Sequence, residues 1–305
     1  MVSQDTDPNM PEEAEWHLRL YQKSLLKQSK LKNIKSLLPP VDGKSCVDVG
    51  GDNGVISFML RKEGGAWQSV DLSEKAVQSI GNLVGEGNAH LIIDNTLPFE
   101  DDSADTIVII DYLEHVENDY GFIKECHRVL RPTGILLCNV PHRKNWSVIR
   151  PLRLLLGLTD ELHGHVRPGY NEHDLYHLLR DGFDIIQART YNRFFVELVD
   201  TGVQFLSTFI KSSREEDASK GNLIDQEDFS KYIKAFRLYS LIYPILFLAS
   251  KLDLLLMFTR GHSLVVQARS RAWNPRREVK IADGRSIAEA SIRTKIGTAA
   301  DLKQR

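Results

Sequence analysis

Apolar segments alternate with helix-like segments between residues 45 and 140, and this alternation is the feature that most limits the fold. The expected strands cover 45–50, 67–72, 89–94, 104–113 and 134–140, and the expected helices cover 54–64, 74–84 and 116–130. Strands that are apolar along their whole length, separated by helices, are typical of a parallel sheet with both faces covered. The alternation therefore predicts an α/β protein.

The rest of the chain predicts additions to this sheet. A helix with a basic outer face is expected within 14–38, where Pro39 and Pro40 stop it. Further strands are expected at 183–191 and 262–270, and a helix capped by Asn171 at 172–181. We therefore divide the chain into a disordered leader (1–13), an N-terminal helix (14–40), the main domain (41–195 with 260–272), a helical insertion (196–259) and a polar tail (273–305).

Composition excludes several classes of protein. The net charge of -2 lacks the basic surplus that a nucleic-acid-binding protein usually shows. The three cysteines form no C-x-x-C pair, so we expect reduced core thiols. The polar, acidic N-terminus lacks the pattern of a secretory signal, and we expect a cytoplasmic location, with contact at the inner face of a membrane left open.

Four acidic residues fall at the ends of the first four expected strands: Asp48, Asp71, Asp94 and Asp111. In an open parallel sheet, ligands bind at the carboxyl ends of the strands. Acids would repel a phosphate group, but they suit a ligand with hydroxyls and a positive charge.

These acids and the motifs around them resemble the class I S-adenosylmethionine-dependent methyltransferases. "VDVGGDNG" resembles their glycine-rich first motif, and "LPFEDDSADTIVIIDYLEHVEND" with "FIKECHRVLRPTGILLCNVP" resembles their fourth and fifth motifs. The resemblance covers about residues 44 to 142 and implies a Rossmann-like seven-stranded sheet with helices on both faces. It also implies that Asp71 meets the ribose hydroxyls and that Asp94 meets the adenine amino group. The implied cofactor-binding set is Asp48, Gly50, Gly51, Asp52, Gly54, Asp71, Leu72, Asp94, Asn95, Asp111 and Tyr112.

The chain departs from the family pattern at Asp52 and Thr133, both of which replace common glycines. Aspartate tolerates unusual turn angles better than most residues, so Asp52 is compatible with the turn. It is either a solvated turn residue or a contact near the methionine ammonium. A dinucleotide site fits less well, because G-x-G-x-x-G is absent.

Candidates for the chemistry lie on loops at the same edge. Methyl transfer needs an acceptor held in line with the methyl group, and a base only if the acceptor must lose a proton. We expect His115, His142 and His165 as catalytic candidates, and Arg143, Arg167 and Tyr170 as substrate-binding residues. Each has a structural alternative: bracing of a helix start for His115, a capping or surface role for His142, and anchoring of its loop to a core acid for Arg167.

A histidine-rich stretch raises the question of a metal. His163, His165, His173 and His177 lie close together in sequence, and the last two share a helix face. No H-E-x-x-H motif or nearby cysteine pair is present, and metal-dependent methyltransferases usually use carboxylates. We therefore expect no metal.

An apolar insertion at 238–258 leaves three interpretations open. Its uncharged run is too short to span a bilayer, and Pro244, Lys251 and Asp253 interrupt the segment. It is a transmembrane helix, a buried lid over the sheet edge, or an interfacial anchor. The basic and apolar stretch 143–158 favours the anchor.

We therefore expect an S-adenosylmethionine-dependent methyltransferase that acts on a small-molecule or lipid-linked acceptor, with oxygen as the favoured atom. The alternative is a catalytically inactive, membrane-associated binding protein on the same fold. Nucleic acid is not expected as a partner, and the sequence leaves the oligomeric state open.

Overall fold

The computed structural model describes residues 11–144, 149–158, 164–208, 229–256 and 258–275. The chain divides into two units, 1–272 and 273–305, and only 273–275 of the second are described. The expected leader (1–13) and tail (273–305) therefore lie mostly outside the described residues.

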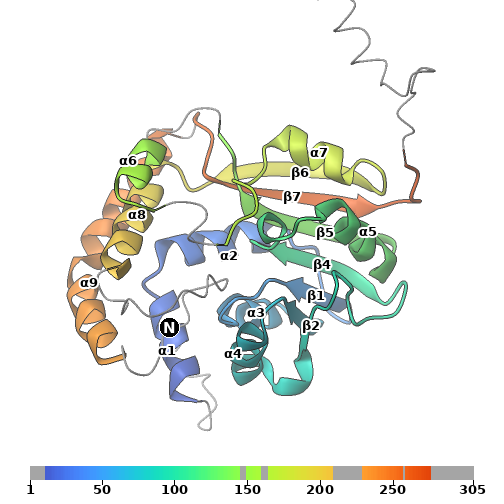
Figure 1. Cartoon of the computed structure of the whole chain (residues 1–305), viewed down its shortest axis with the longest axis horizontal. Coiled ribbons are helices and arrows are strands. Elements are labelled where there is room, and N and C mark those ends of the chain that lie inside the picture. Colours follow the sequence, from blue (N-terminus) through green and yellow to red (C-terminus); the bar gives the residue numbers. More distant parts are fainter. Residues whose placement is uncertain (1–10, 145–148, 159–163, 209–228, 257, 276–305) are drawn as a thin grey trace, which may run out of the picture. The chain divides into compact units, whose positions relative to one another are not determined.

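The first unit is built on a seven-stranded sheet (Figure 1). The strands run in the order β3-β2-β1-β4-β5-β7-β6. They are β1 (Ser45–Val49), β2 (Ala66–Asp71), β3 (Ala89–Leu91), β4 (Ala104–Ile110), β5 (Leu130–Pro141), β6 (Phe183–Tyr191) and β7 (Ser263–Ser270). β1 to β5 pair in parallel, whereas β7 is antiparallel to both β5 and β6. The α/β class is confirmed.

Helices cover both faces of the sheet (Figure 1). The helices between the strands are α3 (Val55–Arg61), α4 (Glu74–Val84), α5 (Asp119–Val129), α6 (Ile149–Leu155) and α7 (Glu172–Leu179), with short 3-10 turns η1 (Glu86–Asn88) and η2 (Leu113–His115). One face is closed by a core in which Ile34 and Leu60 meet Val108 and Val265. Ser73 caps α4 and Asn171 caps α7, as the sequence predicts.

The N-terminal region contains two helices where one was expected. α1 (Glu12–Tyr21) and α2 (Leu25–Leu37) are separated at Ser24, whose side chain caps α2. The expectation of a basic outer face on this segment was incomplete, because Lys27 and Lys30 of α2 point toward acids at the sheet edge.

The insertion between β6 and β7 is helical, as expected, and contains α8 (Phe194–Thr208), α9 (Phe229–Ser250) and η5 (Lys251–Leu256). These helices lie together with α6 at one side of the sheet (Figure 1). Most described apolar side chains of α9 and η5 are exposed, so this segment is not a buried lid.

Candidate cofactor and acceptor site

The glycine-rich loop joins β1 to α3 at the carboxyl edge of the sheet. Gly50, Asp52 and Gly54 all have positive φ angles, of 84°, 54° and 79°. A Cβ atom at Gly54 would lie 2.8 Å from the Cα of Ile80, so the loop packs too closely on α4 for a side chain there. At Gly51 a Cβ would lie 2.4 Å from the Ser57 hydroxyl oxygen. Sequence and packing together therefore fix the shape of this loop.

Asp48 supports the loop from below. It lies inside β1 and not at its end, and it is fully buried. Its carboxylate accepts hydrogen bonds from Ser57, from Ser69 at 2.7 Å and from Arg61 at 3.4 Å. Its oxygens face α3 and β2, which suits bracing of the turn, and its membership of the cofactor-binding set stays a prediction.

Asp71 ends β2 beside the glycine loop. One of its oxygens accepts from the backbone N–H of Leu72 at 2.7 Å and of Ser73 at 3.3 Å, and the other from the N–H of Asp52 at 3.3 Å. The carboxylate is buried between the loop and the start of α4. Leu72, the next residue, is 38% exposed and forms part of the surface at this edge.

Asp94 and Asn95 lie in a turn that follows β3. Both have left-handed φ angles, 51° and 58°, and a bridge between Ile93 and Thr96 closes the turn. The turn presents the Asp94 carboxylate to solvent. Because β3 is the neighbour of β2, this turn lies at the same edge of the sheet as Asp71.

Asp111 follows β4 and belongs to a buried polar chain. Its carboxylate forms an ion pair with Lys30 and accepts from Asn139 of β5 at 2.8 Å, and Asn139 in turn accepts from the hydroxyl of Tyr191. Burial disfavours the charge of Lys30, but Asp111, Asp52 and Glu114 outweigh this and raise the Lys30 pKa. Lys30 therefore lies among the acids of the site. Sequence reasoning did not identify it, although its place on the amphipathic helix was the available signal.

Tyr112, next to Asp111, is fully buried and packs against Phe122 with ring centroids 4.6 Å apart. Burial raises the pKa of its phenol. The ring forms part of the packed wall of the site.

His17 of α1 was also missed. Its ring is 1% exposed, and neither ring nitrogen has a hydrogen-bond partner among the described residues. Burial and the charge of Lys27 lower the pKa of His17 to about 4, against an opposing effect of Asp52. One oxygen of Asp52 is likewise buried without a partner in the described part of the chain. Two unsatisfied polar groups beside the glycine loop fit a site that a polar ligand completes.

Two of the three expected catalytic histidines come together. The rings of His115 and His165 meet edge to face at 4.9 Å, and Nδ1 of His115 lies 3.0 Å from the Gly164 carbonyl oxygen. Glu114 joins them, with ligand atoms of all three residues within 4.8 Å of one another. A carboxylate and two imidazoles are a donor set that a divalent cation accepts. The exposed pair His173–His177 on α7 has its Nε2 atoms 3.0 Å apart, and His163 lies outside the described residues.

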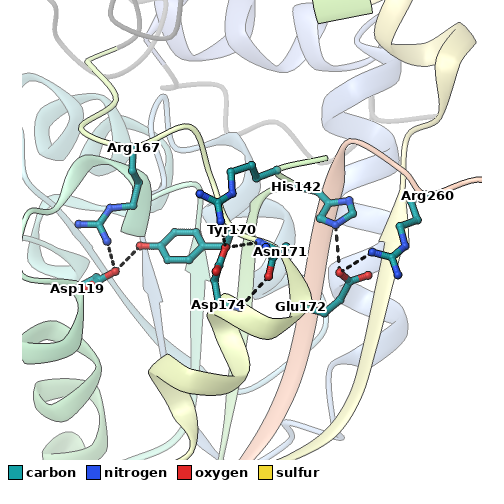
Figure 2. A network of polar contacts seen from close by, with 9 residues as sticks. Asp119, His142, Arg167, Tyr170, Asn171, Glu172, Asp174 and Arg260 are labelled. Carbon is teal, nitrogen blue, oxygen red and sulfur yellow. Dashed lines mark hydrogen bonds and ion pairs between the residues drawn. The ribbon is translucent and has the colours of Figure 1, made fainter. Parts of the chain in front are cut away.

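His142 lies in a different group. Its ring is buried, with Nδ1 2.7 Å from the Gly261 carbonyl oxygen and Nε2 3.4 Å from Glu172. Figure 2 shows it turned toward Glu172 and Arg260. Both nitrogens of His142 therefore face groups of the protein, and its expected role as a base stays a prediction.

Arg167 and Tyr170 anchor the loop before α7. Arg167 pairs with Asp119 and donates to the carbonyl oxygens of Val116 and Glu117, and the Tyr170 hydroxyl lies 2.8 Å from the same Asp119 carboxylate (Figure 2). Tyr170 is only 4% exposed. These contacts agree with the loop-anchor alternative, and a role of the two residues in substrate binding stays a prediction.

A cavity of about 1040 Å³ opens beside this network. Arg143, which pairs with Asp174 at 2.9 Å, lines it together with Glu172 and Arg260. Apolar walls come from four residues: Ile149, Phe194, Phe195 and Leu256. A cavity of this size, with apolar walls and few polar groups, is typical of a small-molecule site.

Glu197 and His262 lie against each other in the wall of this cavity. Burial raises the pKa of Glu197 to about 8, against the opposing charges of Lys144 and Arg153. Burial, followed by the charge of Lys144, lowers the pKa of His262 to about 2.

Comparison with known proteins agrees with the fold and the sheet-edge site. Residues 47–138 match the sequence model of the family described as "Methyltransferase domain". The chain therefore contains a class I methyltransferase domain, whose cofactor is S-adenosylmethionine. The family resemblance, the fold class and the cofactor inferred from sequence are confirmed.

Among curated relatives, a demethylmenaquinone methyltransferase of Tropheryma whipplei is 28% identical over 107 residues, which are 34% of this chain and 45% of the relative. A ubiquinone biosynthesis O-methyltransferase of Pasteurella multocida is 26% identical over 123 residues, 35% of this chain and 51% of the relative. The chain spans about half the length of the curated relatives it matches.

Among solved structures, the [4+2]-cyclase SpnF superposes with a TM-score of 0.52 and 15% identity, covering 79% of this chain and 80% of that one. At this identity the likeness concerns the fold alone, and a fold does not fix a reaction.

The residues fit S-adenosylmethionine. The loop 50–54 and Asp71 would hold its methionine and ribose parts, and the turn at Asp94 and Asn95 would meet its adenine. His17 and the unsatisfied oxygen of Asp52 supply polar partners that the described protein leaves unused. When bound, the cofactor supplies an electrophilic methyl group.

Proposed function

We propose that this protein transfers the methyl group of S-adenosylmethionine to an oxygen of a small-molecule or lipid-linked acceptor. The observation that carries the proposal is the hydrogen bond from Nδ1 of His115 to the Gly164 carbonyl at the cofactor edge of the sheet. A carbonyl oxygen can only accept, so Nδ1 carries the proton and Nε2 is the basic nitrogen of the neutral ring. An imidazole in this tautomer can take the proton that a hydroxyl acceptor loses.

The chain's own residues would perform two further tasks. Glu114 and His165 lie against His115 and orient its ring. The cavity beside α7 offers apolar walls and the cations Arg143 and Arg260, which suit a flat apolar acceptor with polar substituents. The names of the curated relatives, which concern ubiquinone and demethylmenaquinone, support acceptors of this chemical type.

The experiment has two stages. Isothermal titration of the full chain with S-adenosylmethionine tests the cofactor site, and transfer of a radiolabelled methyl group to hydroxylated aromatic and quinol acceptors tests the reaction. Binding followed by label in an ether product is the expected result. A folded protein that fails to bind the cofactor would overturn the proposal. Binding without transfer to any acceptor would favour the catalytically inactive binding protein.

A further inference from the structure

An exposed apolar surface runs along α9 and η5. Six side chains on it are between 67% and 82% exposed, and we call them the apolar patch: Leu241, Ile245, Leu248, Leu254, Leu255 and Phe258. The segment Tyr239–Leu256 has a mean hydropathy of 1.5, and only 6% of it is buried. α6, which packs on α8 beside these helices, adds the exposed Leu154 and Leu155. Soluble proteins rarely expose contiguous apolar surface of this kind without a partner.

The opposite face of α9 is attached to the N-terminal helices. The Phe236 ring meets Trp16 of α1 at 5.0 Å between centroids, the Tyr239 hydroxyl donates to the Lys23 carbonyl at 2.8 Å, and the Tyr243 hydroxyl accepts from Gln28 at 3.2 Å. Positions 236, 239 and 243 lie on one side of a helix, whereas 241, 245 and 248 lie on the other. α9 therefore has one face against the protein and one open face, which is the arrangement of a helix lying flat on a surface.

The exposed charged side chains described on α6, α9 and η5 have one sign. α6, α9 and η5 contain a single acid, Asp253, which is buried and accepts from the backbone N–H groups of Arg193 and Phe195. Among the side chains that the structure describes on these helices, the exposed charged ones are cations: Arg150, Arg237 and Lys251. Lys251 also covers the Phe247 ring, 4.3 Å from its centroid. Apolar side chains flanked by cations match the boundary between anionic headgroups and acyl chains.

We propose that the apolar patch docks this protein on an anionic bilayer, with α9 lying in the interface plane. Pro244 and the polar pair Lys251–Asp253 interrupt the segment, and its attached inner face would have to leave α1 and α2 before it could span a membrane. Docking does not depend on the proposed methyl transfer.

The patch also borders the acceptor cavity. Leu256 of η5 and Ile149 of α6 line the cavity, and both belong to helices that carry exposed leucines. Docking on these helices would therefore place the cavity next to the bilayer, where an apolar acceptor concentrates.

Flotation of the full chain with vesicles tests the proposal. Vesicles of phosphatidylcholine with and without about one third phosphatidylglycerol separate the apolar and electrostatic contributions. We expect co-flotation that is stronger with the anionic lipid and weaker in high salt. Each of Arg150→Gln, Arg237→Gln and Lys251→Gln should weaken binding to the anionic vesicles by about five-fold. Absence of flotation with anionic vesicles would overturn the proposal.

The variant Leu241→Gln/Ile245→Gln/Leu248→Gln removes the apolar contacts without adding charge. We expect at least about a hundred-fold weaker vesicle binding, because three aliphatic side chains that the bilayer would bury are lost from the contact. Tyr176→Gln and Ile186→Gln, exposed apolar residues elsewhere, are matched controls and should float like the wild type. Titration with S-adenosylmethionine should be unchanged in all of them, which separates this result from a failure of the cofactor site.

Two results would contradict the proposal in specific ways. Unchanged flotation of the triple variant would show that another surface binds the lipid. A wild-type dimer that becomes a monomer in the triple variant, without vesicle binding, would identify the patch as an interface between two copies of this chain.

Discussion

Lys27 on α2 holds its ammonium 3.2 Å from the carboxylate of Asp52 in the glycine-rich loop. Lys30, one turn further along the helix, pairs with Asp111 after β4. α2 thus supplies two cations to an edge of the sheet that is otherwise acidic. This explains why an aspartate is accepted in the loop: its backbone tolerates a positive φ and its charge has a partner.

The first prediction concerns Asp71. Asp71→Ala should weaken S-adenosylmethionine binding by 2–4 kcal/mol, about 30- to 1000-fold, because charged hydrogen bonds to a diol are lost. Titration calorimetry measures this. Asp184→Ala, at an exposed acid of β6 paired with Arg271, is the control and should leave affinity unchanged. Equal affinities in Asp71→Ala and wild type would show that the ribose is not placed at β2.

The second prediction concerns pH and His17. Its pKa falls from 6.5 to about 4 on folding, so between these values the unfolded chain binds a proton that the folded chain does not. Stability should therefore fall as pH falls through this window, by a contribution on the order of 3 kcal/mol.

Urea unfolding of wild type and His17→Gln between pH 7.5 and 4.5 isolates this contribution, because Glu197 and His262 are common to both proteins. The variant should lose less stability on acidification, whereas His173→Gln, at an exposed site on α7, should behave as wild type. Parallel curves for wild type and His17→Gln would contradict the burial of a neutral ring.

A third prediction concerns Thr133, which has a φ of 66° at an exposed position. A β-branched residue is strained there, and glycine is not. Thr133→Gly should stabilise the protein by about 1 kcal/mol after the entropy cost of glycine in the unfolded chain. Thr96→Gly is the control, because Thr96 is not among the described residues with positive φ, and it should not stabilise. The urea concentration at the midpoint of unfolding, compared among wild type, Thr133→Gly and Thr96→Gly, measures this difference in stability.

The fourth prediction concerns Gly54. Gly54→Ala combines a positive φ with a contact 2.8 Å from the Ile80 backbone, so α4 or the loop must shift. We expect a loss of at least about 2 kcal/mol in stability and weaker cofactor binding. Gly87→Ala, where a Cβ meets no atom within 4 Å, should be close to neutral. A stable Gly54→Ala protein with wild-type affinity would show that the loop is less constrained than its packing indicates.

The fifth prediction tests the base. His115→Gln should lower the rate of methyl transfer by about 10²–10⁴-fold and remove the acidic limb of the pH profile, which reflects protonation of the base, while the affinity for S-adenosylmethionine stays constant. His142→Gln, whose ring contacts Gly261 and Glu172, should change transfer far less at saturating acceptor. A larger loss in His142→Gln than in His115→Gln would reverse the two roles.

The sequence by itself determined the sheet and the ligand class, but not every strand boundary: β3 and β4 end three residues earlier than expected, and β5 begins four residues earlier. Each strand from β1 to β5 is apolar enough to identify alone, and the loop glycines and strand-end acids are local in sequence, so their meeting at one edge follows from parallel topology. The sequence also showed the exposed helix of the insertion as a run of apolar residues, but it did not show which face of that helix is free.

Tertiary structure decided which polar groups face each other. His17 and Lys30 are distant in sequence from the glycine loop and from Asp111, and only the packing of α1 and α2 brings them there. The contacts of Arg167 and His142 have the same origin. Arg167 meets Asp119 and His142 meets Glu172, and these contacts join distant segments that no local sequence pattern records. Spacing along a strand or helix fixes neighbours within that element, whereas partners across elements are set by the fold as a whole.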